Sequence, residues 1–170
     1  MARRLGRPFV DSDARIREIA GQTIAEIFRK QGEDAFRAIE ADVIGEVSRG
    51  AAVVALGGGA IAQPGAPARL ARLGTVVYLR TAPERLLERL GDPSTRPLLA
   101  RLPAAERANR LAQLLAQREE AYLSAVIVVD TDELAADEVA LEVARRFTAG
   151  SASGAERGES GNEPGNESGK

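Results

Sequence analysis

The chain has 170 residues, with 23 Lys and Arg against 25 Asp and Glu, and a formal net charge of −2. A hydrophobic fraction of 44% suits one globular domain, and the charge balance excludes a broad basic surface for nucleic acid. The absence of cysteine and histidine excludes disulfides, thiolate–zinc sites and histidine bases, so any metal would be a hard cation such as Mg²⁺ held by oxygen atoms. No segment is apolar enough to span a bilayer and no signal peptide is evident, so we expect a cytoplasmic protein without a membrane partner.

Strands and helices are expected to alternate from the N-terminus. Phe9–Asp11 predicts a short strand, and Asp13 is placed to cap a helix over 14–20. Thr23 and Glu26 form a capping box that starts the next helical turns.

The rest of the chain continues this alternation. A longer helix is expected at about 32–48, because its apolar residues fall on one face. Near-continuous apolar strands between helices indicate an α/β fold, with a parallel sheet flanked by helices. The further strands are expected at 52–56, 75–79 and 126–129, and the further helices at 65–73, 83–90, 104–122 and 135–147.

Composition divides the chain into a folded domain and a tail. From residue 149 the sequence becomes rich in Gly, Ser, Glu and Asn, which cannot bury enough surface to offset chain entropy. We therefore predict a domain over 1–148 and a disordered tail over 149–170. Gly and Pro are concentrated in 91–103, which indicates a loop or lid at about 91–108.

Three consecutive glycines, Gly57, Gly58 and Gly59, follow the apolar strand at 52–56. Ligands of parallel α/β proteins bind at the carboxyl ends of strands. Glycine has no side chain, so a ligand can approach the backbone closely there. The triple glycine therefore marks a candidate binding site.

Two acidic residues, Asp11 and Asp13, follow the first strand. They could hold Mg²⁺ or accept hydrogen bonds from substrate hydroxyls, or they could be a helix cap and a surface acid. Arg37, three residues before Glu40, could clamp a carboxylate or form an ordinary surface pair.

Two further arginines have similar alternatives. Arg96, in the proline-rich loop, could close over a phosphate or could be an exposed loop residue. Arg118, one helical turn before Tyr122, could be a second anion clamp or part of a solvated face.

In order and spacing, seven segments closely resemble the shikimate kinase family. The resemblance covers residues 3–147 and implies a fold like that of the nucleoside monophosphate kinases. It also implies transfer of the γ-phosphoryl group of ATP to the 3-hydroxyl of shikimate, in aromatic amino acid biosynthesis. The segments are F-V-D-S-D, T-I-A-E-I-F, G-E-x-A-F-R-x-I-E, V-V-A-L-G-G-G-A, T-V-V-Y-L, R-P-L-L and R-E-E-A-Y.

This resemblance implies roles for the candidate residues. Asp13 would hold the shikimate hydroxyls and orient or deprotonate the nucleophile, and Asp11 would lie near Mg²⁺ and act through water. Arg37 and Arg118 would bind the shikimate carboxylate. Arg96 would be the lid arginine that contacts the ATP phosphates.

The glycines take the remaining roles. Gly58 would offer its backbone to the substrate, and Gly57 and Gly59 would leave room for it.

The sequence departs from the family in one respect. The family's phosphate-binding loop, G-x-x-G-x-G-K-[ST], occurs nowhere in the 170 residues. In the family's strand order, 2-3-1-4-5, the strand before that loop is central, so here the strands at 52–56 and 75–79 would lack their shared neighbour and expose two edges. We expect a truncated chain, whose coding sequence continues upstream of Met1. We also expect no measurable phosphorylation of shikimate by these residues alone.

Two other functions remain open. One is a gluconate-type small-molecule kinase of the same fold, against which the pair of arginines argues. The other is a catalytically inactive subunit that binds a carboxylated ligand or a partner, which would explain the absent loop. For the shikimate kinase reading we expect a monomer with shikimate as its small-molecule substrate.

Overall fold

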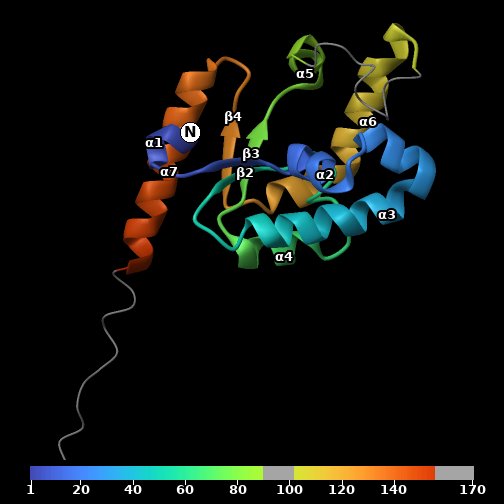
Figure 1. The fold of residues 1–170 in the computed structure, drawn as a ribbon. Helices are drawn as coiled ribbons and strands as arrows, with labels where there is room; N and C mark the ends of the chain where they lie inside the picture. Colours follow the sequence, from blue (N-terminus) through green and yellow to red (C-terminus); the bar gives the residue numbers. More distant parts are fainter. Residues whose placement is uncertain (90–101, 156–170) are drawn as a thin grey trace, which may run out of the picture.

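The computed structural model describes residues 1–89 and 102–155 (Figure 1). Within these ranges, each predicted strand and helix is found, and the strand boundaries differ from the predicted ones by one or two residues. The helices are α1 (Ala2–Leu5), α2 (Ser12–Ala20), α3 (Ile24–Val47), α4 (Ala66–Leu73), α5 (Pro83–Arg89), α6 (Ala104–Leu123) and α7 (Ala136–Ala155). The strands are β1 (Phe9–Asp11), β2 (Val53–Ala55), β3 (Val77–Arg80) and β4 (Ile127–Asp130).

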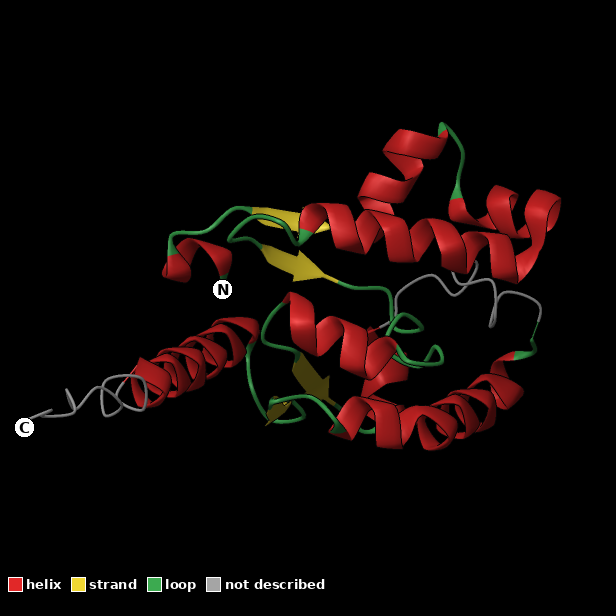
Figure 2. Ribbon diagram, turned by 90° about the horizontal axis from the view of Figure 1, so that it is seen from below, coloured by secondary structure: helices red, strands yellow, loops and turns green. Residues whose placement is uncertain are grey.

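The strands form two separate parallel pairs, which stand apart in Figure 2. In the first pair, β1 runs beside β2 with Phe9 opposite Val53. In the second pair, β3 runs beside β4 with Val77 opposite Ile127. The prediction that the strands at 52–56 and 75–79 lack a shared neighbour is thus confirmed for the described residues.

The first helix after β1 begins earlier than the sequence predicts. Asp11, rather than Asp13, is the N-cap of α2, and its Oδ1 accepts hydrogen bonds from the backbone N–H groups of Asp13 (2.9 Å) and Ala14 (3.1 Å). The cap prediction for Asp13 was therefore wrong. Asp11 takes this role because its extended backbone turns the carboxylate over the first helical N–H groups.

The capping box at the start of α3 is confirmed. Thr23 Oγ1 accepts from the Glu26 N–H, and the Glu26 carboxylate accepts from the Thr23 N–H. Gly32 interrupts the helix with φ of 85°, so the chain bends between the predicted short helical turns and the predicted longer helix.

The hydrophobic core, like the sheet, is divided into separate parts. One cluster joins α2 and α3, a second joins the end of α3 to α4, and a third joins β4 to α7. α1 lies against α7, where the Arg7 guanidinium sits 5.0 Å from the centre of the Phe147 ring. The buried residues of the three clusters are, in turn, Ile16, Ile27, Phe36 and Val43; Ile44, Ala60, Ile61 and Leu70; and Ile127, Val129 and Val143.

The last helix is longer than expected. α7 continues to Ala155, beyond the helix end that the sequence predicts at about 147. Extending an existing helix fixes one residue for each hydrogen bond gained, which offsets the poor propensities of Gly and Ser. The rest of the predicted tail and most of the predicted lid, including Arg96, lie outside the described residues. No helix in the described ranges is long and apolar enough to cross a membrane.

Candidate active site

The three glycines after β2 lie against the polar side chains of α2 and α3. A methyl group added at Gly57 would lie 3.0 Å from Glu40 Oε1 and 3.1 Å from Asp13 Oδ1. A methyl group added at Gly59 would collide with the guanidinium of Arg37. Neither glycine has a positive φ, so glycine is needed here for close approach rather than for backbone freedom.

Arg37 is the central cation of the site. Its Nη1 donates to Glu40 Oε2 (2.8 Å), and its Nη2 and Nε donate to Glu33 Oε1 (3.0 and 3.3 Å). Burial lowers the pKa of Arg37, but the two carboxylates outweigh it, so the guanidinium stays charged. Among the described residues these contacts use three of its five N–H groups, which leaves two for a ligand carboxylate.

Glu40 is buried, with only 3% of its side chain exposed. Burial raises the pKa of its carboxyl, Asp13 raises it further, and the ion pair with Arg37 acts in the opposite direction. Glu40 Oε2 accepts from Arg37, whereas Oε1 faces Gly57 and has no hydrogen-bond partner in the part of the chain that the structure describes. A buried polar atom without a partner is costly, and its position beside the glycines is where a ligand hydroxyl or water would satisfy it.

The third wall of the site comes from α6. Tyr122 Oη donates to the carbonyl of Gly58 at 2.6 Å, and Arg118 Nη1 reaches the same oxygen at 3.4 Å. The two side chains are one turn apart, so they share a helix face, and the Tyr122 ring stacks on Tyr78 with centroids 4.8 Å apart. α6 thus brings a second arginine to the loop that Arg37 contacts from α3.

The acidic residues divide between two tasks. Asp11 caps α2 through Oδ1, and Asp13 lies beside Gly57 with Glu40. The described residues contain no group of three acidic side chains that could hold a metal ion. Asp11 therefore fits Mg²⁺ only as one ligand of an ion whose other ligands are water and substrate oxygens.

The structure brings most of the predicted site residues together. Asp13, Arg37 and Arg118 reach the three glycines from α2, α3 and α6, and Asp11 lies at the start of α2. The sequence analysis paired Glu40 with Arg37 but gave Tyr122 no role of its own. The spacing of one helical turn between Arg118 and Tyr122 could have indicated that both side chains reach the same loop. Ser12 and Arg69 each carry a buried polar atom that has no hydrogen-bond partner within residues 1–89 and 102–155, and no sequence pattern indicated this.

Comparison with known proteins gives the same family throughout. The family model described as shikimate kinase matches residues 1–148. A shikimate kinase of Paracidovorax citrulli is 38% identical over 144 residues, 83% of this chain and 77% of that protein. One from Synechococcus is 42% identical over 141 residues, 82% of this chain and 72% of that protein.

Solved structures agree with these matches. The shikimate kinase of Acinetobacter baumannii in complex with shikimate is 37% identical, with a TM-score of 0.80 over 88% of this chain and 83% of that one. The shikimate kinase of Bacteroides thetaiotaomicron is 30% identical, with a TM-score of 0.77. With its arginines and carboxylates gathered at one strand end, this chain belongs to the shikimate kinase family.

Proposed function

We propose that the site at Gly57–Gly59 binds shikimate, in the half of a shikimate kinase site that receives the acid. The observation that carries this is the convergence of Arg37 and Arg118, from two helices, on one glycine loop. A planar carboxylate matches the fork of a guanidinium, and two arginines can hold it from both sides.

The hydroxyls of the ligand would face the carboxylates. Asp13 and Glu40 both border Gly57 and offer acceptor oxygens there. In the phosphoryl transfer, the 3-hydroxyl oxygen would form a bond to the γ-phosphorus of ATP. The bond between that phosphorus and the oxygen that leaves with ADP would break, and Asp13 would receive the hydroxyl proton.

Asp11 would hold Mg²⁺ through water, and the ion would neutralise charge on the phosphates. Arg96 would contact the phosphates from the lid.

The nucleotide half lacks its phosphate cradle. The G-x-x-G-x-G-K-[ST] loop does not occur in the sequence, so backbone N–H groups and a lysine for the phosphates are missing. We therefore expect these 170 residues to bind shikimate without transferring a phosphoryl group to it.

Calorimetry with shikimate and gluconate tests the proposal. We expect saturable binding of shikimate, much weaker binding of gluconate, and no rise of the unfolding midpoint with ATP and Mg²⁺. If the folded chain binds neither acid, the proposed site is wrong. If it binds gluconate as well as shikimate, the alternative gluconate-type kinase is favoured. Turnover of ATP in the presence of shikimate would contradict the expectation that the present chain is inactive.

A further inference from the structure

The three glycines lie in a tight turn whose central peptide links Gly58 to Gly59. The Ala60 N–H donates to the Gly57 carbonyl at 3.0 Å, which closes a four-residue turn over 57–60. Turns of this kind differ in the direction that the central peptide faces, and a flip of that peptide exchanges the places of its carbonyl and its N–H. The orientation of this one peptide therefore decides whether the loop presents a donor or an acceptor at a given place.

Glycine makes such a flip easy at this position. The flipped turn needs a φ of about +80° at its third residue, which glycine adopts readily and other residues do not. Gly59 is that third residue, yet its φ lies outside the left-handed region. A larger residue cannot take its place, because an added methyl group would meet the Arg37 guanidinium. A contact from outside the turn is therefore needed to favour the unflipped form.

Tyr122 supplies this contact from α6. Its Oη donates to the Gly58 carbonyl at 2.6 Å, which fixes the direction of the central peptide. The carbonyl and the N–H of a trans peptide point in opposite directions, so the Gly59 N–H faces away from Tyr122. No described residue accepts a hydrogen bond from the N–H of Gly58 or Gly59, so both donors are left for a ligand.

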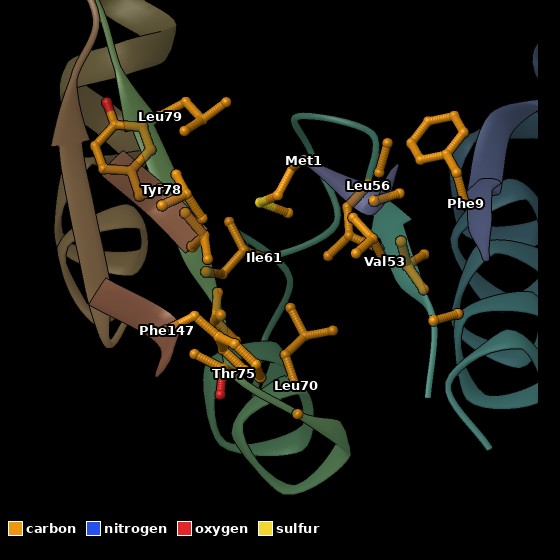
Figure 3. Close-up of a pocket in the computed structure, with 18 of the residues that line it drawn as sticks. Met1, Phe9, Val53, Leu56, Ile61, Leu70, Thr75, Tyr78, Leu79 and Phe147 are labelled. Atoms are coloured by element: carbon orange, nitrogen blue, oxygen red, sulfur yellow. The ribbon is translucent and has the colours of Figure 1, made fainter. Parts of the chain in front are cut away.

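Arg118 reaches the same carbonyl but cannot replace Tyr122. Its Nη1 lies 3.4 Å from the oxygen, at the long limit of a hydrogen bond, so it holds the peptide weakly. In the proposed complex Arg118 turns to the ligand carboxylate and leaves the carbonyl to Tyr122. The Tyr122 ring is itself held, because it stacks on Tyr78 with 15° between the ring planes. Tyr78 and Leu79 extend from β3 to opposite sides (Figure 3).

We propose that Tyr122 is a positioning residue, which holds the central peptide of the glycine turn with the Gly59 N–H turned away from α6 and free for the ligand. The ligand then meets a backbone donor rather than a carbonyl, which suits the oxygen atoms of shikimate. This inference rests on the proposed function and adds to it the residue that sets the shape of the glycine loop. Tyr122 acts through the loop and does not itself contact the ligand.

Two matched variants test the proposal by calorimetry with shikimate. Tyr122→Phe removes the hydrogen bond to the turn, whereas Tyr78→Phe removes the other tyrosine hydroxyl of the chain, and both keep the stacked rings. We expect Tyr122→Phe to lower the affinity about fivefold, the worth of one hydrogen bond, and Tyr78→Phe to change it by less than about twofold. Equal effects of the two variants on the affinity would overturn the proposal.

The φ of Gly59 separates a positioning role from a general loss of stability. NMR measures it through the couplings between the Gly59 N–H and its two α-protons. We expect these couplings to move toward those of a positive φ in Tyr122→Phe and to stay unchanged in Tyr78→Phe. Saturating shikimate should restore them, because the ligand selects the unflipped turn. Couplings that are the same in both variants would overturn the proposal, whatever the affinities are.

Raman spectroscopy covers the case in which Tyr122→Phe does not fold. The chain has two tyrosines, so in Tyr78→Phe the tyrosine bands report on Tyr122 alone. We expect the bands of a hydroxyl that donates a hydrogen bond, both before and after shikimate is added. Loss of this signature on binding would overturn the proposal. If the unchanged chain binds no shikimate, the proposed function fails, and the couplings of Gly59 still decide whether Tyr122 holds the turn.

Discussion

The two strand pairs end in polar clusters of opposite character. At the end of β3 and β4, Arg80 makes two bonds to Asp130, the hydroxyls of Thr81 and Thr131 lie 2.7 Å apart, and Arg89 donates to the Thr131 carbonyl at 2.8 Å. At the end of β1 and β2, by contrast, Glu40 buries an oxygen to which no described residue donates a hydrogen bond.

This difference separates a structural cluster from a binding cluster. Among the described residues, the buried side-chain atoms without a hydrogen-bond partner belong to Ser12, Glu40 and Arg69, on α2, α3 and α4. Satisfied networks hold a fold together, whereas unsatisfied buried groups in a folded protein call for a functional explanation. We therefore expect substitutions at the cluster after β1 and β2 to change ligand binding, and substitutions at the cluster after β3 and β4 to change stability alone.

The largest effect is expected for Arg37→Ala. It removes the two-pronged donor for the ligand carboxylate, and it leaves Glu40 buried without its cation. We expect shikimate affinity to fall about 100-fold and the free energy of unfolding to fall by about 2–3 kcal/mol. Calorimetry and urea denaturation measure the two effects.

A double variant separates these two effects. Arg37→Ala with Glu40→Gln should recover much of the lost stability, because no buried charge is left unpaired, while shikimate binding stays lost. Recovery of shikimate affinity in the double variant would show that Arg37 acts on stability only.

The next effect is that of Gly59→Ala. The added methyl group would meet the Arg37 guanidinium, so that side chain must move out of its position. We expect shikimate affinity to fall about tenfold, with about 1–2 kcal/mol lost in stability. Gly45→Ala in α3 is the matched control: nothing lies within 4 Å of its added methyl group, and the better helix former should add about 0.5–1 kcal/mol. An unchanged affinity in Gly59→Ala would show that the site tolerates a displaced Arg37.

Thr131→Val tests the satisfied cluster. Thr131 is 5% exposed, and its hydroxyl contacts Thr81 and the Arg80 carbonyl. We expect a loss of about 1–2 kcal/mol in urea denaturation, because the partners stay buried, with shikimate affinity unchanged. Thr148→Val on exposed α7 is the control and should change stability by no more than about 0.5 kcal/mol. A tenfold change in affinity for Thr131→Val would remove the contrast between the clusters.

Local sequence signals predicted much of this architecture. Apolar runs and caps gave the order of the elements, because strand and helix periodicity and the Thr23 capping box are local properties. The family's strand order also predicted the two edges of β2 and β3 with which no described strand pairs. The cap at Asp11 and the burial of Glu40 were not predictable in this way, since each depends on where a neighbouring element places its backbone. The Arg69 Nε, which has no hydrogen-bond partner among the described residues, was not predictable for the same reason: the packing of α4 leaves Arg69 half-buried, and no spacing in the sequence reports that.

The smallest effects concern the acid titration of two glutamates, one from each half of the chain. Hydrogen bonds from Arg145 and Arg146 on α7 lower the pKa of Glu142 to about 2, whereas burial raises the pKa of Glu40 above its ordinary value. Unfolding should therefore bind a proton at Glu142 between about pH 4.5 and 2, so the stability from Glu142 is present above 4.5 and is lost as the pH falls toward 2. Glu40 has the opposite sign: its contribution to folding stability is largest below pH 4.5 and decreases as the pH rises through its raised pKa.

Carbon-detected NMR of the glutamate carboxyls, assigned with Glu142→Gln and Glu40→Gln, measures both titration midpoints. Midpoints on the same side of 4.5 would contradict the distinction between a partly exposed carboxylate paired with two arginines and a buried one held at a binding site.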